Sequence, residues 1–315
     1  TSFFVIGDTH FLAERNEPER LNANSAAYTS QLVDTLNRLP GSMFSDAVGG
    51  GAVPVPAGVL HAGDVIDTGD KLGETQLTMQ RTEWAAYAAQ FGMSGQDGRL
   101  KFPIIEVAGN HDAPQGTGHA IEQMSARQMA RSYLKGRSKN GLHGSWDWGG
   151  VHFITLGLIV GTDRSVDRKR RYAAMDSLAF LLEDLAQTPK DQPLVLMHHV
   201  DMARYTVAKP GADYTKWEWD PADVAAFYAA IKGRRAAIFY GHTHVRNVFR
   251  WNGTSIQADD GIAVFNVDNS AHFNGPAQAF FHVEVRGDGF TVREFDTRDG
   301  WKSGAWTPQV WRATV

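Results

Sequence analysis

Between residues 3 and 244, apolar and polar positions form blocks that predict strands and helices in turn. Short apolar runs, partly β-branched and bounded by Gly, Pro or Asp, are typical of strands buried in a sheet. Between them, apolar residues recur at helical spacing, as Leu32, Leu36 and Leu39 do. We expect strands at 3–6, 59–60, 104–107, 151–158, 194–197 and 236–240, and helices at 22–39, 76–91, 119–133, 171–187 and 222–232. This alternation predicts an α/β fold.

The pattern changes after residue 244. Strand-like runs then follow one another without helices, separated by Asn-Gly, Asp-Gly and Gly-Asp-Gly turns. The strands are expected at 245–251, 254–258, 262–267, 279–285 and 290–295. A glycine-rich stretch at 49–58 precedes no helix, so it predicts a surface loop rather than a phosphate cradle. The chain therefore combines an α/β part with a β-rich C-terminal part.

Composition excludes several classes of protein. The 315 residues are 43% hydrophobic and 21% charged, as in globular proteins with a substantial core, and no apolar run approaches a membrane span. With 31 Lys and Arg against 35 Asp and Glu, the net charge of -4 supplies no basic field for long nucleic acids. The chain has 12 His and no Cys, so any metal site must use nitrogen and oxygen ligands.

The absence of cysteine also bears on the compartment. A chain without Cys suits an oxidising environment, which favours export to the periplasm or the exterior over the cytoplasm. Either removal of an initiator methionine or cleavage of a signal peptide explains a start at Thr1. No pattern in the sequence indicates the oligomeric state.

Five short polar motifs stand where apolar runs stop. They are Gly7-Asp8-Thr9-His10, Gly63-Asp64-Val65-Ile66-Asp67, Gly109-Asn110-His111-Asp112, His198-His199 and Gly241-His242-Thr243-His244. Open α/β sheets bind ligands at the carboxyl ends of their strands, so these motifs are expected to converge on one site. Each motif alone is typical of a turn or of a buried histidine. Five of them in this order indicate a functional site.

The residue types in these motifs suit divalent metal ions. The i, i+2 spacing of Asp8 and His10, repeated in His242 and His244, places both side chains of a pair on one face of a strand, where they chelate one ion or reach two adjacent ions. A carboxylate such as Asp64 can offer one oxygen to each of two ions about 3.5 to 4 Å apart. Two such ions carry more charge than Asp8 and Asp64 neutralise, which leaves a positive site for a phosphoryl group.

This ordered set resembles the calcineurin-like metallophosphoesterase family, whose pattern runs D-x-H, G-D-x-x-D, G-N-H-D/E, a later His and G-H-x-H. The resemblance spans residues 8–244. It implies a four-layer α-β-β-α sandwich with a dinuclear site at the strand ends. It also implies one catalytic domain over 1–315, in which the strands of 245–297 complete the second sheet and 298–315 form a tail.

The resemblance assigns the ligands of two divalent ions. Asp8, His10 and His244 would bind one ion, Asn110, His199 and His242 the other, and Asp64 would bridge them. The ligand set does not decide between Mn, Fe, Zn, Co and Ni.

The resemblance also assigns roles beside the ions. His111 corresponds to a non-ligand His that contacts phosphate and protonates the leaving alkoxide, with Asp112 orienting its imidazole. Purple acid phosphatases carry a Tyr where this chain has Asp67, which argues against a Tyr-bound ferric ion. Asp67 and His198 are expected to support ligands or to pack beside them.

The implied activity is hydrolysis of a phosphoester by in-line attack of a metal-bound hydroxide, with no covalent enzyme intermediate. We expect a small or medium diester of nucleotide or phospholipid-headgroup type, and a phosphomonoester is the alternative. A nuclease would need a basic groove that the net charge does not suggest. A non-catalytic scaffold should have lost ligands, whereas this set is complete.

Substrate selectivity is expected in three loops that follow the motifs. They are 11–20 with Arg15 and Arg20, 113–119, and 201–219 with Arg204, Tyr205, Tyr214, Lys216, Trp217 and Trp219. Aromatic rings in the last loop can stack on a base or pack an apolar group, and its cations can pair with a second phosphate. Alternatively, Trp217 and Trp219 only anchor that loop. We expect Trp301, Trp306 and Trp311 to cover a sheet edge.

Overall fold

The computed structural model describes residues 1–162, 172–206, 211, 217–256, 258–287 and 289–314. Tyr214 and Lys216 of the expected substrate loop lie outside the described residues, as does residue 171 at the predicted start of a helix.

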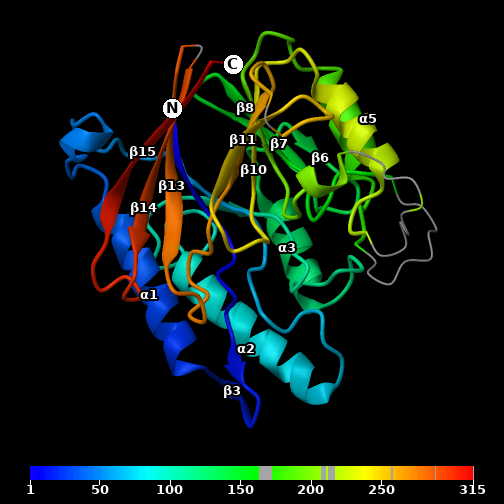
Figure 1. Cartoon of the computed structure of the whole chain (residues 1–315). Coiled ribbons are helices and arrows are strands. Elements are labelled where there is room, and N and C mark those ends of the chain that lie inside the picture. The colour runs from blue at the N-terminus through cyan, green and yellow to red at the C-terminus, as the bar shows by residue number, and fades with distance from the viewer. Residues whose placement is uncertain (163–171, 207–210, 212–216, 257, 288, 315) are drawn as a thin grey trace.

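One sheet has six strands in the order β15-β14-β13-β1-β4-β5 (Figure 1). They are β1 (Ser2–Ile6), β4 (Val59–His61), β5 (Ile104–Glu106), β13 (Gln278–Arg286), β14 (Gly289–Thr297) and β15 (Ala305–Thr314). The strands β1, β4 and β5 run parallel, and β13 pairs antiparallel with β1. The strands predicted from the N-terminal apolar runs are confirmed here.

The other sheet has seven strands in the order β11-β12-β10-β9-β8-β7-β6. They are β6 (Gly136–Arg137), β7 (Gly144–Trp148), β8 (Val151–Thr155), β9 (Leu194–Met197), β10 (Ala236–Tyr240), β11 (Asn247–Trp251) and β12 (Ile262–Asn266). At its centre β8, β9, β10 and β12 run parallel. Strands β6 and β7 were not predicted, because a two-residue strand and a Gly-Ser-Trp-Asp-Trp run carry little periodic signal.

Helices cover the outer faces of both sheets, which gives the predicted four layers (Figure 1). The helices are α1 (Ala23–Arg38), α2 (Glu74–Phe91), α3 (His119–Ala130), α4 (Ser177–Leu185) and α5 (Pro221–Ile231). Side chains of α1, α2 and α3 pack on the six-stranded sheet, and those of α4 and α5 pack on the seven-stranded sheet. None of the helices in the described ranges is long and apolar enough to cross a membrane.

Alternation along a strand sends its side chains into two different apolar cores, as β1 shows. On β1, Phe3 and Val5 point to the core between the two sheets, where the rings of Phe3 and Phe153 lie 5.1 Å apart. Phe4 and Ile6 point the other way and join the core beneath the helices. Because successive side chains of a strand face opposite sides, the continuous apolar run of β1 reflects burial on both faces.

The prediction that the strands of 245–297 complete the second sheet is wrong, because they divide between the two sheets. Strands β11 and β12 join the seven-stranded sheet, whereas β13 and β14 join the six-stranded sheet beside β1. The chain therefore crosses between the sheets at 267–277. In addition, 298–315 is not only a tail, because it contains β15, the edge strand that carries Trp306 and Trp311. Trp301 is buried against Phe280.

The strand predicted at 254–258 is also wrong for its described residues, which form the connection between β11 and β12. The side-chain oxygen of Asn252 accepts hydrogen bonds from the backbone N–H groups of Thr254 and Ser255. This local turn satisfies backbone N–H groups that a strand would pair with a neighbouring strand.

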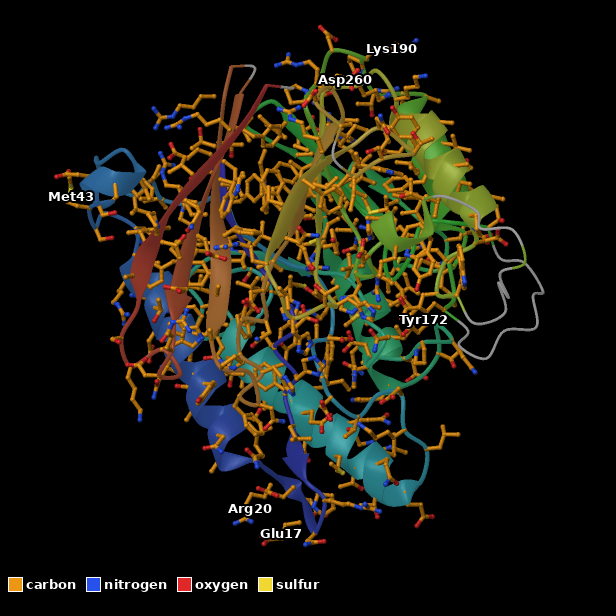
Figure 2. The ribbon with its side chains drawn as sticks, in the orientation of Figure 1. Glu17, Arg20, Met43, Tyr172, Lys190 and Asp260 are labelled. Atoms are coloured by element: carbon orange, nitrogen blue, oxygen red, sulfur yellow. The ribbon has the colours of Figure 1, made fainter. Side chains whose placement is uncertain are left out.

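Two predicted loops differ in outcome. The stretch 49–58 is a loop, as predicted, and Figure 2 shows Met43 projecting from the same region. The expected substrate loop 11–20 instead contains a hairpin of β2 (Ala13–Glu14) and β3 (Glu17–Leu21). Its Arg20 pairs with Glu17 at 3.0 Å, and both lie at the lower tip of the molecule in Figure 2, away from Tyr172.

Candidate metal centre

The five polar motifs meet at one edge of the sandwich. Strands β1, β4 and β5 of one sheet and β9 and β10 of the other end just before them. The side chains of Asp8, His10, Asp64 and His199 are almost completely buried there. Convergence follows from the parallel arrangement, because parallel strands place their carboxyl ends along the same edge of a sheet.

The first group of donors contains Asp8, His10, Asp64 and His244, and one ligand atom of each lies within 4.8 Å of the others. The Nε2 atoms of His10 and His244 are 3.1 Å apart. His244 Nε2 lies 3.3 Å from Asp8 Oδ1, and His10 Nε2 lies 3.6 Å from Asp64 Oδ2. These are the three residues that the family resemblance assigned to one ion, together with the bridging residue that it implied.

The second group contains Asp64, His199 and His242, again within 4.8 Å. Asn110 completes it, since its Oδ1 lies 3.1 Å from His199 Nε2 and 2.7 Å from His242 Nδ1. Asp64 belongs to both groups through one atom, because its Oδ2 faces His199 Nε2 at 3.2 Å as well as His10. Its Oδ1 accepts a hydrogen bond from the backbone N–H of His111 at 2.7 Å.

This donor set fits two divalent ions. It consists of carboxylate and amide oxygens and imidazole nitrogens, which suit borderline divalent metals. Burial would raise the pKa of Asp64, but the charges of His199 and His10 lower it well below its usual range. The carboxylate is therefore ionised, as a metal ligand must be.

The backbone at these positions is held in an uncommon conformation. Among the residues that the structure describes, eight that are not glycine have a positive φ. Five of them are predicted ligands, namely Asp8, His10, Asp64, His242 and His244. Such residues cost about 1 to 3 kcal/mol each and cluster at functional sites. The i, i+2 spacing thus acts through left-handed residues beyond the strand ends, and not through a strand face as we expected.

Glycines leave space for the buried carboxylates. A Cβ on Gly109 would lie 2.2 Å from both the backbone nitrogen and Oδ1 of Asp64. At Gly241 a Cβ would lie 2.5 Å from Asp8 Oδ2. The glycine that precedes the Asn-His-Asp motif is therefore required for close approach to Asp64 rather than for a special φ.

We expect Gly109→Ala to destabilise the protein by about 1 to 3 kcal/mol, as overpacking of a close contact does, and to lower the number of metal ions bound. Thermal unfolding and elemental analysis of the purified variant would measure both effects. Gly289→Ala is the matched control, because the nearest atom to its new Cβ would be Arg286 O at 3.7 Å. Unchanged stability and full metal content in Gly109→Ala would contradict the requirement for space at Asp64.

His111 belongs to neither of the two groups, and one of its ring nitrogens lies within 4.8 Å of ligand atoms of His10 and Asp67. Its Nδ1 donates to the backbone oxygen of Asp67 at 3.0 Å, and about a third of its side chain, 33%, is exposed. Burial opposes protonation, but the charge of Asp64 and the bond to Asp67 raise the pKa of His111. The expectation that Asp112 orients this imidazole is therefore corrected, since Asp67 makes that contact.

Asp112 has a different role. Its carboxylate accepts hydrogen bonds from the backbone N–H groups of Val65, Ile66 and Gly109, at 2.7 to 3.2 Å. It thereby ties the loop after β4 to the loop after β5. Burial and the nearby charge of Asp64 raise the pKa of Asp112 to about 7.

Asp67 and His198 lie around the groups in different ways. Asp67 Oδ1 is 3.1 Å from His10 Nδ1, and Lys71 pairs with its other oxygen at 3.2 Å. His198 is buried with its ring stacked on Tyr240 and packed against Trp219, and burial lowers its pKa to about 3. Asp67 thus contacts a predicted ligand, whereas His198 packs in the core.

A cleft of about 640 Å³ opens onto the two groups. Its lining consists of Asp64, Asp70, Asn110, His111, Pro114, Gln115, Tyr172, His242, Thr243 and His244. Pro114 and Gln115 belong to the expected substrate loop 113–119, which the structure brings to the cleft. Arg20 is absent from this described lining.

The described residues of the expected substrate loop 201–219 are not among those that line the cleft. Arg204 lies 3.3 Å from Asp201 and 3.4 Å from Glu218, and the rings of Tyr205 and Trp217 are 5.2 Å apart. Trp219 is buried and its indole N–H donates to the backbone oxygen of Val200 at 3.2 Å. These contacts hold Trp219 in the core, which is what the anchoring alternative predicts.

Sequence reasoning missed two residues next to the groups. Glu218 lies with Oε1 3.3 Å from His242 Nε2. The ring of His272 lies 4.5 Å from that of His10 and 5.0 Å from that of His244. Neither stands in a strand-end motif. The sequence offered only a hint for Glu218, which lies between Trp217 and Trp219 in the aromatic loop, and no hint for His272.

Comparisons with known proteins agree with this arrangement. A sequence profile of the family described as calcineurin-like phosphoesterase matches residues 1–246. No curated protein matches the sequence. Among solved structures, a dimetal phosphatase from Danio rerio is 12% identical with a TM-score of 0.57, and the match covers 99% of this chain and 98% of that one. The structure of PhoD is 12% identical with a TM-score of 0.55, covering 97% and 71%.

At these identities, the solved structures show a shared fold. The family match spans all five motifs, and the structure gathers their side chains at one cleft with a donor set that fits divalent ions. This protein belongs to the calcineurin-like phosphoesterase family and is a metal-dependent phosphoester hydrolase.

Proposed function

We propose that the protein hydrolyses a small or medium phosphodiester in the cleft, with two divalent ions. Asp8, His10 and His244 would hold one ion, Asn110, His199 and His242 would hold the other, and Asp64 would contribute to both sites. The observation that carries this proposal is Asp64 Oδ2, which faces both groups of donors. When bound, the ions supply positive charge for the phosphoryl oxygens and lower the pKa of a coordinated water.

His111 supplies the proton for the leaving group. Its Nδ1 is occupied by the backbone oxygen of Asp67, so Nε2 is the nitrogen that remains for a substrate oxygen. The side chain lines the cleft, and its pKa is raised by the charge of Asp64 against the effect of burial. A positioned imidazole of this kind contributes about 10² to 10⁴-fold to a reaction rate.

The charge of the cleft favours a diester over a monoester. Within the described part of the chain, the lining contains neither Lys nor Arg, and it includes the carboxylate of Asp70. Lys71, the next residue, is paired with Asp67. A phosphodiester carries one negative charge, whereas a monoester carries about two near pH 7. The described lining offers no additional cation for the second charge of a monoester. This supports a diester as the substrate, with a phosphomonoester as the alternative.

A direct test compares nitrophenyl phosphate with bis-nitrophenyl phosphate. The metal-stripped protein is reloaded separately with Mn²⁺, Zn²⁺ and Fe²⁺, which also addresses the identity of the metal. We expect kcat/KM for the diester to exceed that for the monoester. A clear monoester preference would replace the diester proposal by the alternative. Turnover of neither substrate with two ions bound would contradict both forms.

A further inference from the structure

We propose that Glu218 is a positioning residue that holds the His242 imidazole in the orientation needed to bind the second ion. This inference rests on the proposed function only in placing an ion beside His242. It extends the site to a residue that stands in none of the five motifs. It also connects the loop 201–219 to the metal centre.

The position of Glu218 is set by its neighbours in the chain. It precedes Trp219, which is buried, and Asp220, whose side chain accepts from the N–H of Ala222 and caps α5. Pro221 occupies the first turn of that helix. The backbone that follows Glu218 is thus held by a core residue and by a helix start, which limits where the Glu218 side chain can reach.

The two nitrogens of His242 face different partners. Nδ1 lies 2.7 Å from Asn110 Oδ1, within the second group of donors, whereas Nε2 lies 3.3 Å from Glu218 Oε1. An imidazole that binds a metal through one nitrogen carries its proton on the other. A carboxylate at Nε2 therefore selects the tautomer in which Nδ1 is the ligand atom.

Glu218 is itself held in place by the same loop. Its Oε2 accepts a hydrogen bond from the Tyr205 hydroxyl at 2.8 Å and lies 3.4 Å from Arg204 Nη2. On the other side, the Tyr172 hydroxyl lies 3.4 Å from Oε1. The glutamate is 3% exposed, so these contacts are shielded from solvent. A carboxylate with this many partners keeps a defined orientation toward His242.

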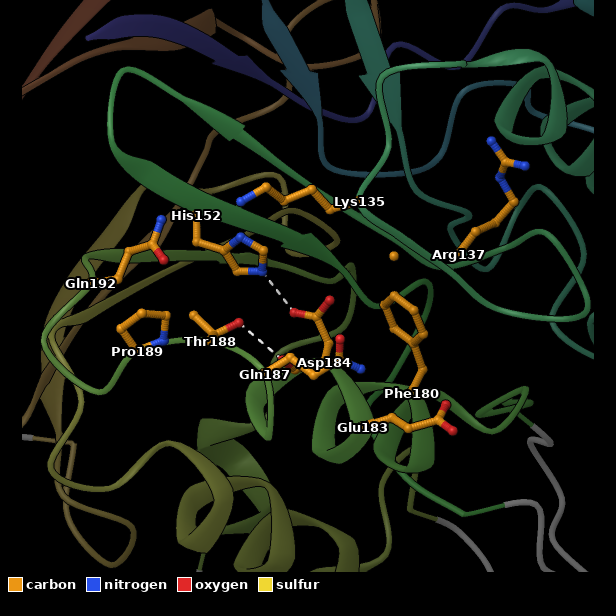
Figure 3. Close-up of a pocket in the computed structure, with 11 residues that line it drawn as sticks. Lys135, Arg137, His152, Phe180, Glu183, Asp184, Gln187, Thr188, Pro189 and Gln192 are labelled. Carbon is orange, nitrogen blue, oxygen red and sulfur yellow. Dashed lines mark hydrogen bonds and ion pairs between the residues drawn. The ribbon is translucent and has the colours of Figure 1, made fainter.

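A second carboxylate–histidine pair provides a matched control. His152 Nε2 lies 2.7 Å from Asp184 Oδ2, in a separate pocket formed between β8 and α4 (Figure 3). Both side chains are largely buried, as are His242 and Glu218. None of the donors of the two metal groups lines this second pocket. Asp184→Asn therefore reports what the loss of such a pair does to the protein without affecting the metal centre.

The experiment is calorimetric titration of the metal-stripped full chain with Mn²⁺, and separately with Zn²⁺. The variants are Glu218→Gln, Glu218→Leu, Asp184→Asn and His242→Ala, with circular dichroism to show that each is folded. His242→Ala identifies the binding step that depends on this histidine. We expect Glu218→Gln to weaken that step about tenfold and Glu218→Leu about 100-fold, with the other step and Asp184→Asn unchanged. The amide retains an acceptor oxygen, which explains the smaller effect.

The outcomes separate this inference from the proposed function. Equal metal affinities for wild type and both Glu218 variants would overturn the inference. An affinity loss of the same size in both binding steps, or in Asp184→Asn, would also overturn it. Wild-type protein that binds fewer than two ions would overturn it as well. If two ions bind and the Glu218 variants weaken one of them, but neither nitrophenyl ester is hydrolysed, the inference stands and the proposed function fails.

Discussion

Replacing Asp64 with Asn is expected to abolish binding of the ion pair and to reduce turnover by more than about 10³-fold, since loss of even one stabilising contact to a developing charge costs about 10² to 10³-fold. Asp64 Oδ2 faces His10 and His199, one from each group of donors, so a single substitution affects both. Asn is nearly isosteric, and its amide oxygen can still accept from the backbone N–H of His111. The fold should therefore persist while the charge between the two groups is lost.

Metal content and turnover of the bis-nitrophenyl diester would be measured on the same preparation of Asp64→Asn. Asp184→Asn serves as the control, because it removes a buried carboxylate charge from a histidine pair outside the cleft. Wild-type turnover in Asp64→Asn would disprove the bridging assignment. If the folded variant retains two ions but loses turnover, Asp64 acts in the reaction and is not required for metal binding.

His111→Ala is expected to lower kcat by about 10² to 10⁴-fold and to leave the metal content intact. The His111 side chain lines the cleft and contacts Asp67 through Nδ1. Neither of the two groups of donors includes His111. Its backbone N–H, which donates to Asp64, is preserved in the alanine variant. The substitution therefore removes the proton donor but not the contact that holds Asp64.

His119→Ala is the control for this variant, because His119 begins α3 and is not among the described residues that line the cleft. Diesters with better leaving groups should be less affected by His111→Ala, since they need less protonation as they depart. Loss of an ion from His111→Ala would mean that His111 is a ligand. An equal rate loss for good and poor leaving groups would disprove the role of a proton donor.

Local sequence determined the chemistry of this site and the order of its parts. Apolar runs predicted the strands β1, β4, β5, β9 and β10, and a polar motif follows each of them. Residue types alone restricted the ligands to oxygen and nitrogen, because the chain has no Cys. These features are readable because strand periodicity and ligand chemistry depend on residues close together in the chain.

Local patterns misled where a segment's partner is distant. The described residues of 254–258 form the connection between β11 and β12 and not the predicted strand, whereas the weak pattern of 305–314 forms the edge strand β15 because β14 lies beside it. Strand β13 belongs to the six-stranded sheet because it pairs with β1, which is more than 270 residues away in the sequence. Strand pairing over such separations is decided by packing and not by propensity.

The contacts that support the ligands were decided only by the tertiary structure. Asp112 follows His111 in the chain, yet its carboxylate binds backbone N–H groups, and the oxygen of Asp67 orients the imidazole instead. Glu218 contacts His242, which lies 24 residues further along the chain. His272 contacts His10 from the segment that connects the two sheets. A hydrogen bond requires atoms within about 3 Å, and only the assembled fold determines which distant side chains come that close. The sequence by itself thus determined which groups could bind metal, and the tertiary structure decided which groups hold them in position.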